Sequence, residues 1–484
     1  MQAKNLLLIM SDEHDPRYMG VSGHSVIETP SLDRLAERGT RFTNAYTPSP
    51  ICVPARASFA TGRYVHDIRY WDNAMGYEGK VPSWGHRLQK AGNRVDAIGK
   101  LHYRRQEDSL GFDHQINTMH IYDGIGQVWG SIRDPLPEGG PERRMFHKIG
   151  PGVSNYNLYD RQCANAACEW LQQRGEEEDQ DRPWMLYVGF AAPHFPLVVP
   201  SEYLDRYQLD CLPSRKLHPR DGYQHHPWIQ TQERFMSQEG LFADENERQL
   251  ARRAYYGLCT FLDSQIGMIL DALQDCGLVD TTRIIYTSDH GDNLGARGLW
   301  GKSNLYEEST KIPMIIAGPQ VSAGQVCRTP VSLVDCYPTI LQGVGISMKD
   351  EEHNLPGNSL FELMNAPENL ERVVLSEYHA VGSSSGAYML RKGRFKYHYY
   401  VGLPPELFDL ENDPEETIDL AKDKNYASVL EMLERKLRQY LDPEAVDAKA
   451  KADQAELIKK FGGRDKAFRM GAKGATPAPG QGSE

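Results

Sequence analysis

Short apolar runs that alternate with amphipathic helical patterns constrain the fold of this chain more than any other feature of its sequence. The first run, residues 5–10, ends directly in charged residues, as a strand does when both of its faces are buried in a parallel sheet. Similar patterns recur farther along: strands at 41–46, 184–190, 282–288 and 313–317, and helices at 29–39, 55–61, 253–274 and 334–341. This alternation predicts an α/β sandwich around a central, mostly parallel sheet, with functional side chains at the carboxyl ends of its strands.

The pattern of the sequence changes near residue 356. Short strand patterns with tight connections follow, at 373–376, 386–390, 395–400 and 406–410, and then a helical pattern at 427–441. We therefore expect a larger α/β domain over residues 1–355 and a smaller C-terminal α+β domain with an antiparallel sheet over residues 356–445. Residues 446–484 are predicted to form a helix and then a flexible tail, a candidate for oligomerisation.

Charge and composition exclude several classes of function. Lys and Arg number 54 against 66 Asp and Glu, a net charge of −12, so no basic surface is expected for nucleic acid. The longest apolar run near the start, residues 6–10, is too short for a membrane span or a secretory signal. Eight cysteines are scattered without the dense spacing of a disulfide scaffold. These features predict a cytoplasmic protein with reduced thiols and with neither a membrane nor a nucleic acid as partner.

The most specific motif lies in residues 49–63, Ser-Pro-Ile-Cys-Val-Pro-Ala-Arg-Ala-Ser-Phe-Ala-Thr-Gly-Arg. Cys52 is followed at fixed spacing by Pro54, by Arg56 and by Thr61-Gly62. This pattern resembles the signature of the sulfatases, a family of the alkaline phosphatase superfamily. In that family an enzyme oxidises the cysteine to formylglycine, and the hydrated aldehyde is the nucleophile. The alternative interpretation is a buried cysteine in a proline-containing turn.

Acidic residues close two of the predicted strands. Asp12 follows the first strand, and Asp289-His290 follows the strand at 282–288. A single aspartate there is usually a turn or cap residue, but two strand ends and an oxygen donor at position 52 suit a hard divalent cation. The resemblance implies that Asp12, Asp289, His290 and the modified Cys52 bind one metal ion. Many sulfatases have a second aspartate where Glu13 stands and an asparagine where His290 stands; the imidazole makes Mn²⁺ a candidate beside Ca²⁺.

The resemblance also implies a set of cationic and polar residues that hold and cleave the ester: Arg56, Asn73, Lys100, His102, His194 and Lys302. Taken singly, a lysine is usually a solvated surface residue and a histidine is more often structural than catalytic. Their order beside the Cys52 motif favours function. The transition state of sulfate transfer spreads negative charge over several oxygens, which fixed positive charges and a metal stabilise.

The family's mechanism gives each of these residues a role. Asp289 takes a proton from the formylglycine hydrate, which attacks sulfur, while His194 and Lys302 assist the departing alcohol. The covalent sulfate hemiester then collapses to the aldehyde, with His102 as the base. Arg56 is expected to hold the hydrate and the metal carboxylates. These roles follow from the resemblance and not from spacing.

The sequence thus predicts a metal-dependent hydrolase of aryl or small alkyl sulfate esters, promiscuous toward phosphonate and phosphate esters. The Asp-His motif is similar to that of choline sulfatases, phosphonate monoester hydrolases and related arylsulfatases. Phosphonate monoester or phosphodiester hydrolysis is the alternative, although that branch is expected to replace Lys100 and His102 by neutral hydroxyl residues. A non-catalytic binding relative is the least favoured function. The expected partners are a small-molecule sulfate ester, a formylglycine-generating enzyme and further copies of the chain in a homo-oligomer.

Aromatic residues near the motifs are candidates for a cage around the alcohol part of the substrate, although ordinary packing positions are favoured for each: Trp71, Tyr122, Trp129 and Trp300. Glu377 and His379, at the start of the smaller domain, are weaker candidates for the pocket rim.

Overall fold

The apolar run at the start of the chain forms β1 (Asn5–Asp12), and all of its residues are buried. The computed structural model describes residues 4–140, 148–177, 182–208, 212, 216–472 and 474–480. In it β1 is a central strand of an eight-stranded sheet, ordered β11-β2-β10-β9-β1-β7-β4-β5. The other strands are β2 (Gly39–Phe42), β4 (Arg94–Lys100), β5 (His114–Met119), β7 (Trp184–Pro193), β9 (Thr282–Ser288), β10 (Met314–Ala317) and β11 (Gln325–Cys327). Only β10 runs antiparallel to its neighbours, so the predicted mostly parallel sheet is confirmed.

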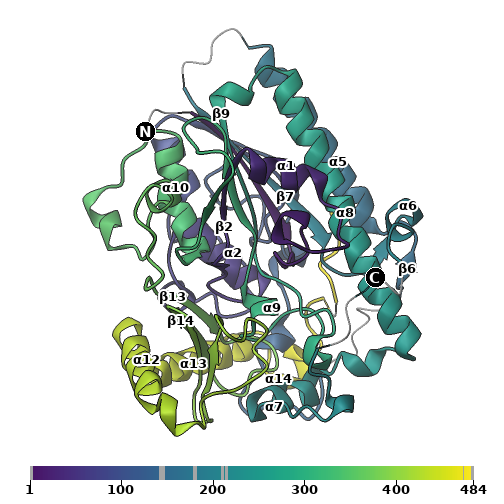
Figure 1. Ribbon diagram of the computed structural model, residues 1–484, viewed down its shortest axis with the longest axis vertical. Coiled ribbons are helices and arrows are strands. Elements are labelled where there is room, and N and C mark those ends of the chain that lie inside the picture. The colour runs from purple at the N-terminus through teal and green to yellow at the C-terminus, as the bar shows by residue number, and fades with distance from the viewer. Residues whose placement is uncertain are drawn as a thin grey trace.

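Helices cover both faces of this sheet (Figure 1). One face packs against α1 (Pro30–Glu37), α5 (Asn155–Gly175) and α8 (Glu245–Asp275). The other packs against α2 (Cys52–Thr61), α4 (Trp84–Lys90) and α10 (Cys336–Gly343). Alternation along β1 links the layers, because Leu7 and Ile9 point into the first core while Leu6 and Leu8 point into the second. The result is the predicted α/β sandwich.

The C-terminal part of the chain forms a second, smaller sheet at the bottom of Figure 1. Its antiparallel strands are β13 (Val374–Tyr378), β14 (Ala387–Lys392), β15 (Phe395–Tyr400) and β16 (Glu406–Asp409). The helix α12 (Ala427–Tyr440) packs on this sheet through Leu433 and Leu437. The predicted α+β character is confirmed, whereas the boundaries at residues 355 and 445 stay predictions.

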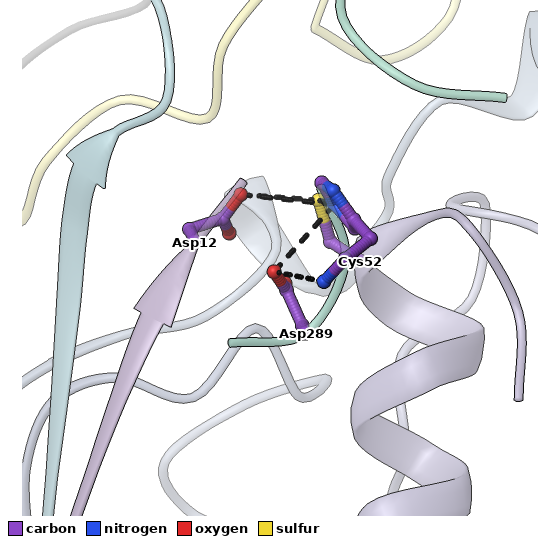
Figure 2. Close-up of side chains that lie close together, drawn as sticks. Asp12, Cys52 and Asp289 are labelled. Atoms are coloured by element: carbon purple, nitrogen blue, oxygen red, sulfur yellow. Dashed lines mark hydrogen bonds and ion pairs between the residues drawn. The ribbon is translucent and has the colours of Figure 1, made fainter. Parts of the chain in front are cut away.

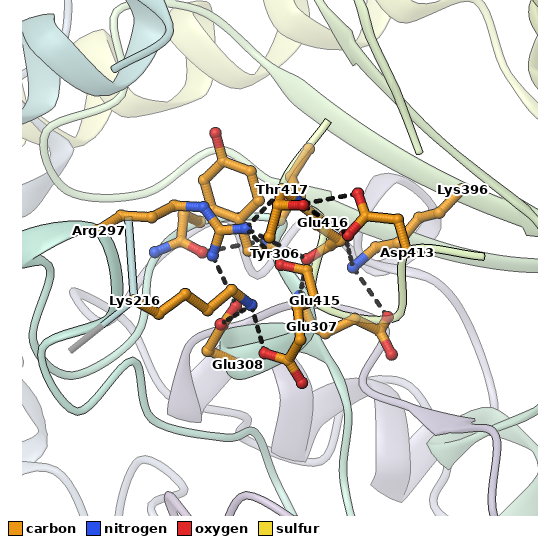
Figure 3. A network of polar contacts seen from close by, with 12 residues as sticks. Lys216, Arg297, Tyr306, Glu307, Glu308, Lys396, Asp413, Glu415, Glu416 and Thr417 are labelled. Carbon is orange, nitrogen blue, oxygen red and sulfur yellow. Dashed lines mark hydrogen bonds and ion pairs between the residues drawn. The ribbon is translucent and has the colours of Figure 1, made fainter. Parts of the chain in front are cut away.

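A buried ion network joins the smaller sheet to the short helix that precedes β10 of the central sheet (Figure 3). Lys396 Nζ on β15 lies 3.0 Å from Glu307 Oε1 on α9 (Glu307–Thr310) and 2.9 Å from Glu416 Oε1. Nearby, Arg297 Nη1 lies 3.0 Å from Glu308 Oε2. These side chains are almost fully buried. Because a buried charge without a partner is costly, the network fixes the relative position of the two sheets.

The remaining elements are short strands and connecting helices: β3 (Ala45–Tyr46), β6 (Gly150–Pro151), β8 (Val198–Val199), β12 (Val331–Ser332), α3 (Val65–Ile68), α6 (Ser201–Leu204), α7 (Pro227–Met236), α11 (Leu360–Leu363), α13 (Pro443–Lys460) and α14 (Arg464–Ala467). The predicted helix after residue 445 corresponds to α13. Its Asp447 and Gln454 side chains accept hydrogen bonds from Arg133, which lies in the first third of the chain. Docking of this region on a neighbouring subunit stays a prediction. Among the described residues, no helix combines the length and apolar character needed to cross a membrane.

Candidate active site

Four strands carry predicted site residues to one edge of the central sheet. Asp12 ends β1, Lys100 ends β4, His194 directly follows β7, and Asp289 directly follows β9. All four strands are parallel, so their carboxyl ends meet although the residues span almost 280 positions in sequence. The topology of the sheet therefore assembles the site.

Cys52 faces the two aspartates from the first turn of α2, as Figure 2 shows. Its Sγ lies 3.7 Å from Asp12 Oδ1 and 3.1 Å from His290 Nε2. The same His290 nitrogen lies 3.6 Å from Asp289 Oδ1. Ligand atoms from all four residues lie within 4.8 Å of one another, and all four residues are buried. Two carboxylates, an imidazole and the atom at position 52 thus form a donor set that fits one divalent cation.

Arg56, one turn into α2, bridges the two carboxylates. Its Nε donates to Asp289 Oδ2 at 2.8 Å, and its Nη2 donates to Asp12 Oδ2 at 3.2 Å. The Nη1 atom donates to the carbonyl oxygen of Lys100 at 2.8 Å and to the hydroxyl of Tyr187 at 3.1 Å. The planar guanidinium therefore fixes both aspartates in one geometry.

The pKa values of Cys52 and Asp12 are shifted in opposite directions by their surroundings. Burial and the Asp12 charge raise the pKa of the Cys52 thiol well above its usual value. Burial also opposes ionisation of Asp12, but Lys100 and Arg56 hold the pKa of that carboxyl below its usual range. The site thus keeps an ionised carboxylate beside a neutral thiol. Reactive cysteines require the opposite shift, so this thiol is a poor nucleophile.

Glu13 is buried and contacts two of the predicted catalytic residues. Lys302 Nζ and His194 Nε2 lie 3.0 and 3.4 Å from Glu13 Oε2. The other ring nitrogen of His194, Nδ1, lies 2.6 Å from the carbonyl oxygen of Phe195 and must carry the proton there. Burial and the Lys302 charge lower the pKa of His194, so its ring is neutral. Lys302, whose pKa Glu13 and Asp12 raise against burial, is the fixed positive charge on this side.

A small cavity of about 40 Å³ opens onto Cys52. The predicted residues Asn73, Lys100, His102, His194 and Lys302 all line it. The Asn73 Oδ1 atom accepts a hydrogen bond from the Val53 backbone N–H at 3.0 Å, which leaves the amide nitrogen as the donor for a ligand. Lys100 Nζ lies 2.8 Å from Asp12 Oδ2. The structure thus brings every predicted site residue to this cavity or to the adjoining metal set, while their catalytic roles stay predictions.

Sequence reasoning missed part of the lining. Gln127 and Gln238 contribute amide groups, and residues 474–476 form part of the wall. No motif marks these positions, because their approach depends on long-range packing. The candidate aromatic residues Trp71, Tyr122, Trp129 and Trp300 are absent from the described lining. Glu377 and His379 are buried and hydrogen-bonded to each other at 3.1 Å, and they are also absent from the lining.

Comparison with known proteins now identifies the class of protein. Residues 4–346 match the family model described as sulfatase, and residues 295–442 match that described as N-sulphoglucosamine sulphohydrolase, C-terminal. The chain belongs to the sulfatase family, whose members hydrolyse sulfate esters with a divalent metal and formylglycine. Membership of this family and the alkaline-phosphatase-like fold are thereby confirmed.

Two relatives and two solved structures illustrate the similarity. Choline-sulfatase of Rhizobium meliloti (strain 1021) is 34% identical over 470 residues, 93% of this chain and 89% of that protein. Arylsulfatase K of Mus musculus is 30% identical over 478 residues, 92% of this chain and 81% of that protein. The phosphonate monoester hydrolase of Agrobacterium radiobacter has a TM-score of 0.72 at 24% identity, covering 92% and 96% of the two chains. That of Silicibacter pomeroyi has a TM-score of 0.72 at 25% identity, covering 91% and 95%.

Proposed function

We propose that this chain hydrolyses sulfate monoesters of aryl or small alkyl alcohols, after a formylglycine-generating enzyme has oxidised Cys52. The observation that carries the proposal is the setting of Cys52, which is buried between a metal-binding donor set and two lysines. The thiol itself is a poor nucleophile there, because burial and the Asp12 charge raise its pKa. An oxygen nucleophile at the same position would lie where both the metal and the lysines act on it.

The donor set fits one divalent metal, held by Asp12, Asp289, His290 and an oxygen at position 52. The metal supplies Lewis acidity, and formylglycine supplies a hydrated aldehyde as the nucleophile. Three of the four ligands are hard oxygen donors and the fourth is a borderline imidazole, which supports Ca²⁺ or Mn²⁺ as the ion. Arg56 keeps the two carboxylates oriented, with hydrogen bonds of 2.8 and 3.2 Å.

The cations of the cavity suit a sulfate group. Lys100 and Lys302 flank Cys52, and the N-terminus of α2 adds a partial positive charge. Their pKa values are raised against burial, chiefly by Asp12 for Lys100 and by Glu13 and Asp12 for Lys302, so both stay protonated. Lys302 can therefore stabilise the departing alkoxide oxygen by charge. His102, whose pKa burial and Lys100 lower, is a neutral base in the same cavity.

Hydrolysis of phosphonate monoesters is the second candidate function. It is favoured by the similarity to the Silicibacter pomeroyi phosphonate monoester hydrolase over 91% of this chain. The presence of Lys100 and His102, which both line the cavity, argues against this second function. A sulfate monoester presents three free oxygens, so two additional donors are useful to it. Some turnover of phosphonate and phosphate esters is expected beside the sulfatase activity, because their geometry is similar.

The test combines peptide mass spectrometry across Cys52 with turnover of 4-nitrophenyl sulfate, choline sulfate and an aryl phosphonate monoester. Formylglycine at position 52 with sulfate turnover above phosphonate turnover is the expected result. The reverse preference would move the chain to the second function. A Cys52→Ala variant, which lacks the modifiable sulfur, is the matched control and should retain its fold without turnover. Unmodified Cys52 in protein from its native cell, with no turnover, would contradict both candidates.

We further propose that the protein is a cytoplasmic homo-oligomer. In support, the seven cysteines described by the structure are all free, as reduced compartments require. Light scattering of the full chain and of a chain ending at residue 445 tests the oligomer. A single-chain mass for the full protein would contradict it.

A further inference from the structure

The chain crosses its own active site near its C-terminal end. We call residues 474–478 the C-terminal segment; Gly474, Ala475 and Thr476 line the same cavity as Cys52. In Figure 1 the yellow trace leaves the smaller domain and rises toward α8, and a pale yellow trace passes above the metal-binding residues in Figure 2. The segment forms neither helix nor strand. It can therefore detach without breaking any regular element.

Three side chains hold the backbone of this region. Trp129 Nε1 donates to the carbonyl oxygen of Ala472 at 3.0 Å, and Gln127 Nε2 donates to that of Gly474 at 3.0 Å. The Tyr156 hydroxyl donates to the carbonyl oxygen of Thr476 at 2.6 Å. Gly471 also approaches the chain closely, since a Cβ atom there would lie 2.0 Å from the backbone oxygen of Gly126. Specific hydrogen bonds and close backbone packing therefore hold this part of the chain against the cavity.

The segment also has an apolar attachment beyond the cavity. Ala478 is only 4% exposed and packs in the core cluster that contains α5 and α8. The next residue, Pro479, is exposed. The buried Ala478 is thus directly followed by the exposed Pro479 at the end of the segment.

Thr476 reaches the predicted base directly. Its Oγ1 lies 2.8 Å from His102 Nε2. The other ring nitrogen of His102, Nδ1, is buried and has no hydrogen-bond partner among the described residues. The orientation of this ring therefore depends on the Thr476 hydroxyl.

The small size of the cavity favours movement of the segment when an ester binds. A volume of about 40 Å³ holds a few atoms at most, whereas pockets for small organic ligands occupy roughly 300–1,000 Å³. A sulfate group takes up much of such a space, so the cavity itself leaves little room for the alcohol part of an ester while residues 474–476 form part of its wall.

We propose that the C-terminal segment is a removable wall of the substrate pocket: withdrawn, it admits the alcohol part of the ester, and back in place after the alcohol has left, it positions His102 through Thr476 for the second step of the reaction. Thr476 is a positioning residue, since it acts through His102. The identity of the ester rests on the proposed function, but the wall itself does not.

The first test displaces the wall and is independent of activity. Ala478→Glu places a charge in the apolar cluster, and Pro479→Glu places the same charge on the exposed neighbour. Hydrogen exchange of the peptide covering residues 471–480 is expected to rise about tenfold or more in Ala478→Glu and to stay unchanged in the control. In the active enzyme, Ala478→Glu should also raise the turnover of bulky relative to small sulfate esters. The proposal would be contradicted if hydrogen exchange in Ala478→Glu stayed at the wild-type rate. It would also be contradicted if exchange rose while the turnover of bulky relative to small esters stayed unchanged.

The second test isolates Thr476. Thr476→Val removes the hydroxyl while keeping the shape, and should lower kcat for a small aryl sulfate about tenfold with little change in KM. Thr476→Ser restores the hydroxyl and should recover kcat. A loss that Ser does not rescue, or an equal change in KM, would exclude the positioning role. A wild-type protein inactive on every ester would contradict the proposed function alone, and the exchange comparison would still decide whether the wall exists.

Discussion

The surroundings of Cys52 disfavour the thiolate, which is the form in which a cysteine acts as a nucleophile. Its thiol lies 3.7 Å from an aspartate and is buried, so the thiolate is disfavoured. The same carboxylates that suppress the thiolate are suitable ligands for a cation. One arrangement thus disfavours sulfur as the nucleophile and favours an oxygen next to a metal.

Arg56 provides a direct residue-level test of this arrangement. Arg56→Lys keeps the charge but loses the fork that reaches both Asp12 and Asp289. We expect kcat/KM for an aryl sulfate to fall by about 10²-fold or more, a loss typical of misplaced catalytic groups. Arg63→Lys, at an exposed position in the same motif, is the matched control and should behave as wild type. Equal activity of the two variants would show that bridging by Arg56 is unnecessary.

Lys302 tests the assignment of the leaving-group charge. Lys302→Ala removes the fixed cation of the Glu13 side of the cavity. For an alkyl sulfate, whose departing oxygen carries more charge, kcat/KM should fall by roughly 10²–10³-fold. For 4-nitrophenyl sulfate the loss should be much smaller, and comparison of the two esters in the same variant is the internal control. Equal losses would assign Lys302 to sulfate binding.

The Cys52 motif predicted most of the site because its residues stand at fixed local spacing or at strand ends. Glu13 was noticed only as a departure from the family pattern, and its contacts with Lys302 and His194 depend on side-chain placement. Thr476 was invisible to sequence reasoning, since it lies 374 positions from His102 and belongs to no motif.

Among the elements, the strands with continuous apolar runs were predicted closely, and β9 and β15 agree with their predicted ranges. The strand β4 was missed because polar residues interrupt its apolar run. The antiparallel direction of β10 was also beyond prediction, since direction depends on the path of the connections and not on hydrophobic pattern.

The ion network between the two sheets makes an element-level prediction. Lys396→Met on β15 should lower the free energy of unfolding by about 3–5 kcal/mol, because Glu307 and Glu416 lose their buried partner. Lys392→Met changes a lysine at the end of β14 whose partner Glu371 is exposed, and should cost about 0–1 kcal/mol. Urea unfolding of both variants measures the difference. Equal costs would mean that the network does not hold the sheets together.

For the whole molecule, the order of the sheet explains why one edge carries the chemistry. The strands β9, β1, β7 and β4 are neighbours, and each delivers a site residue at its carboxyl end. The smaller domain and the C-terminal segment then close the region beyond that edge, since Val381 and residues 474–476 line the cavity. The cavity therefore exists only when distant parts of the chain are folded together.

Coupling of metal binding to global stability follows from this assembly. Asp12, Asp289, His290 and Cys52 approach within 4.8 Å only in the folded chain, so a divalent cation should bind the native state selectively. After treatment with a chelator, Ca²⁺ or Mn²⁺ at about 100 times its Kd should raise the free energy of unfolding by about 2.7 kcal/mol.

Thermal unfolding of paired variants locates this effect without relying on turnover or on the state of Cys52. Asp289→Asn removes one ligand charge and should abolish most of the metal-induced stabilisation, while Asp280→Asn, at an exposed position just before the same strand, should retain it. The stabilisation should also disappear again when excess chelator is added. An equal metal-induced rise in thermal stability in both variants would place the bound metal away from the residues at this edge of the sheet. If added metal did not stabilise the wild-type protein, a metal site in the unmodified chain would be contradicted.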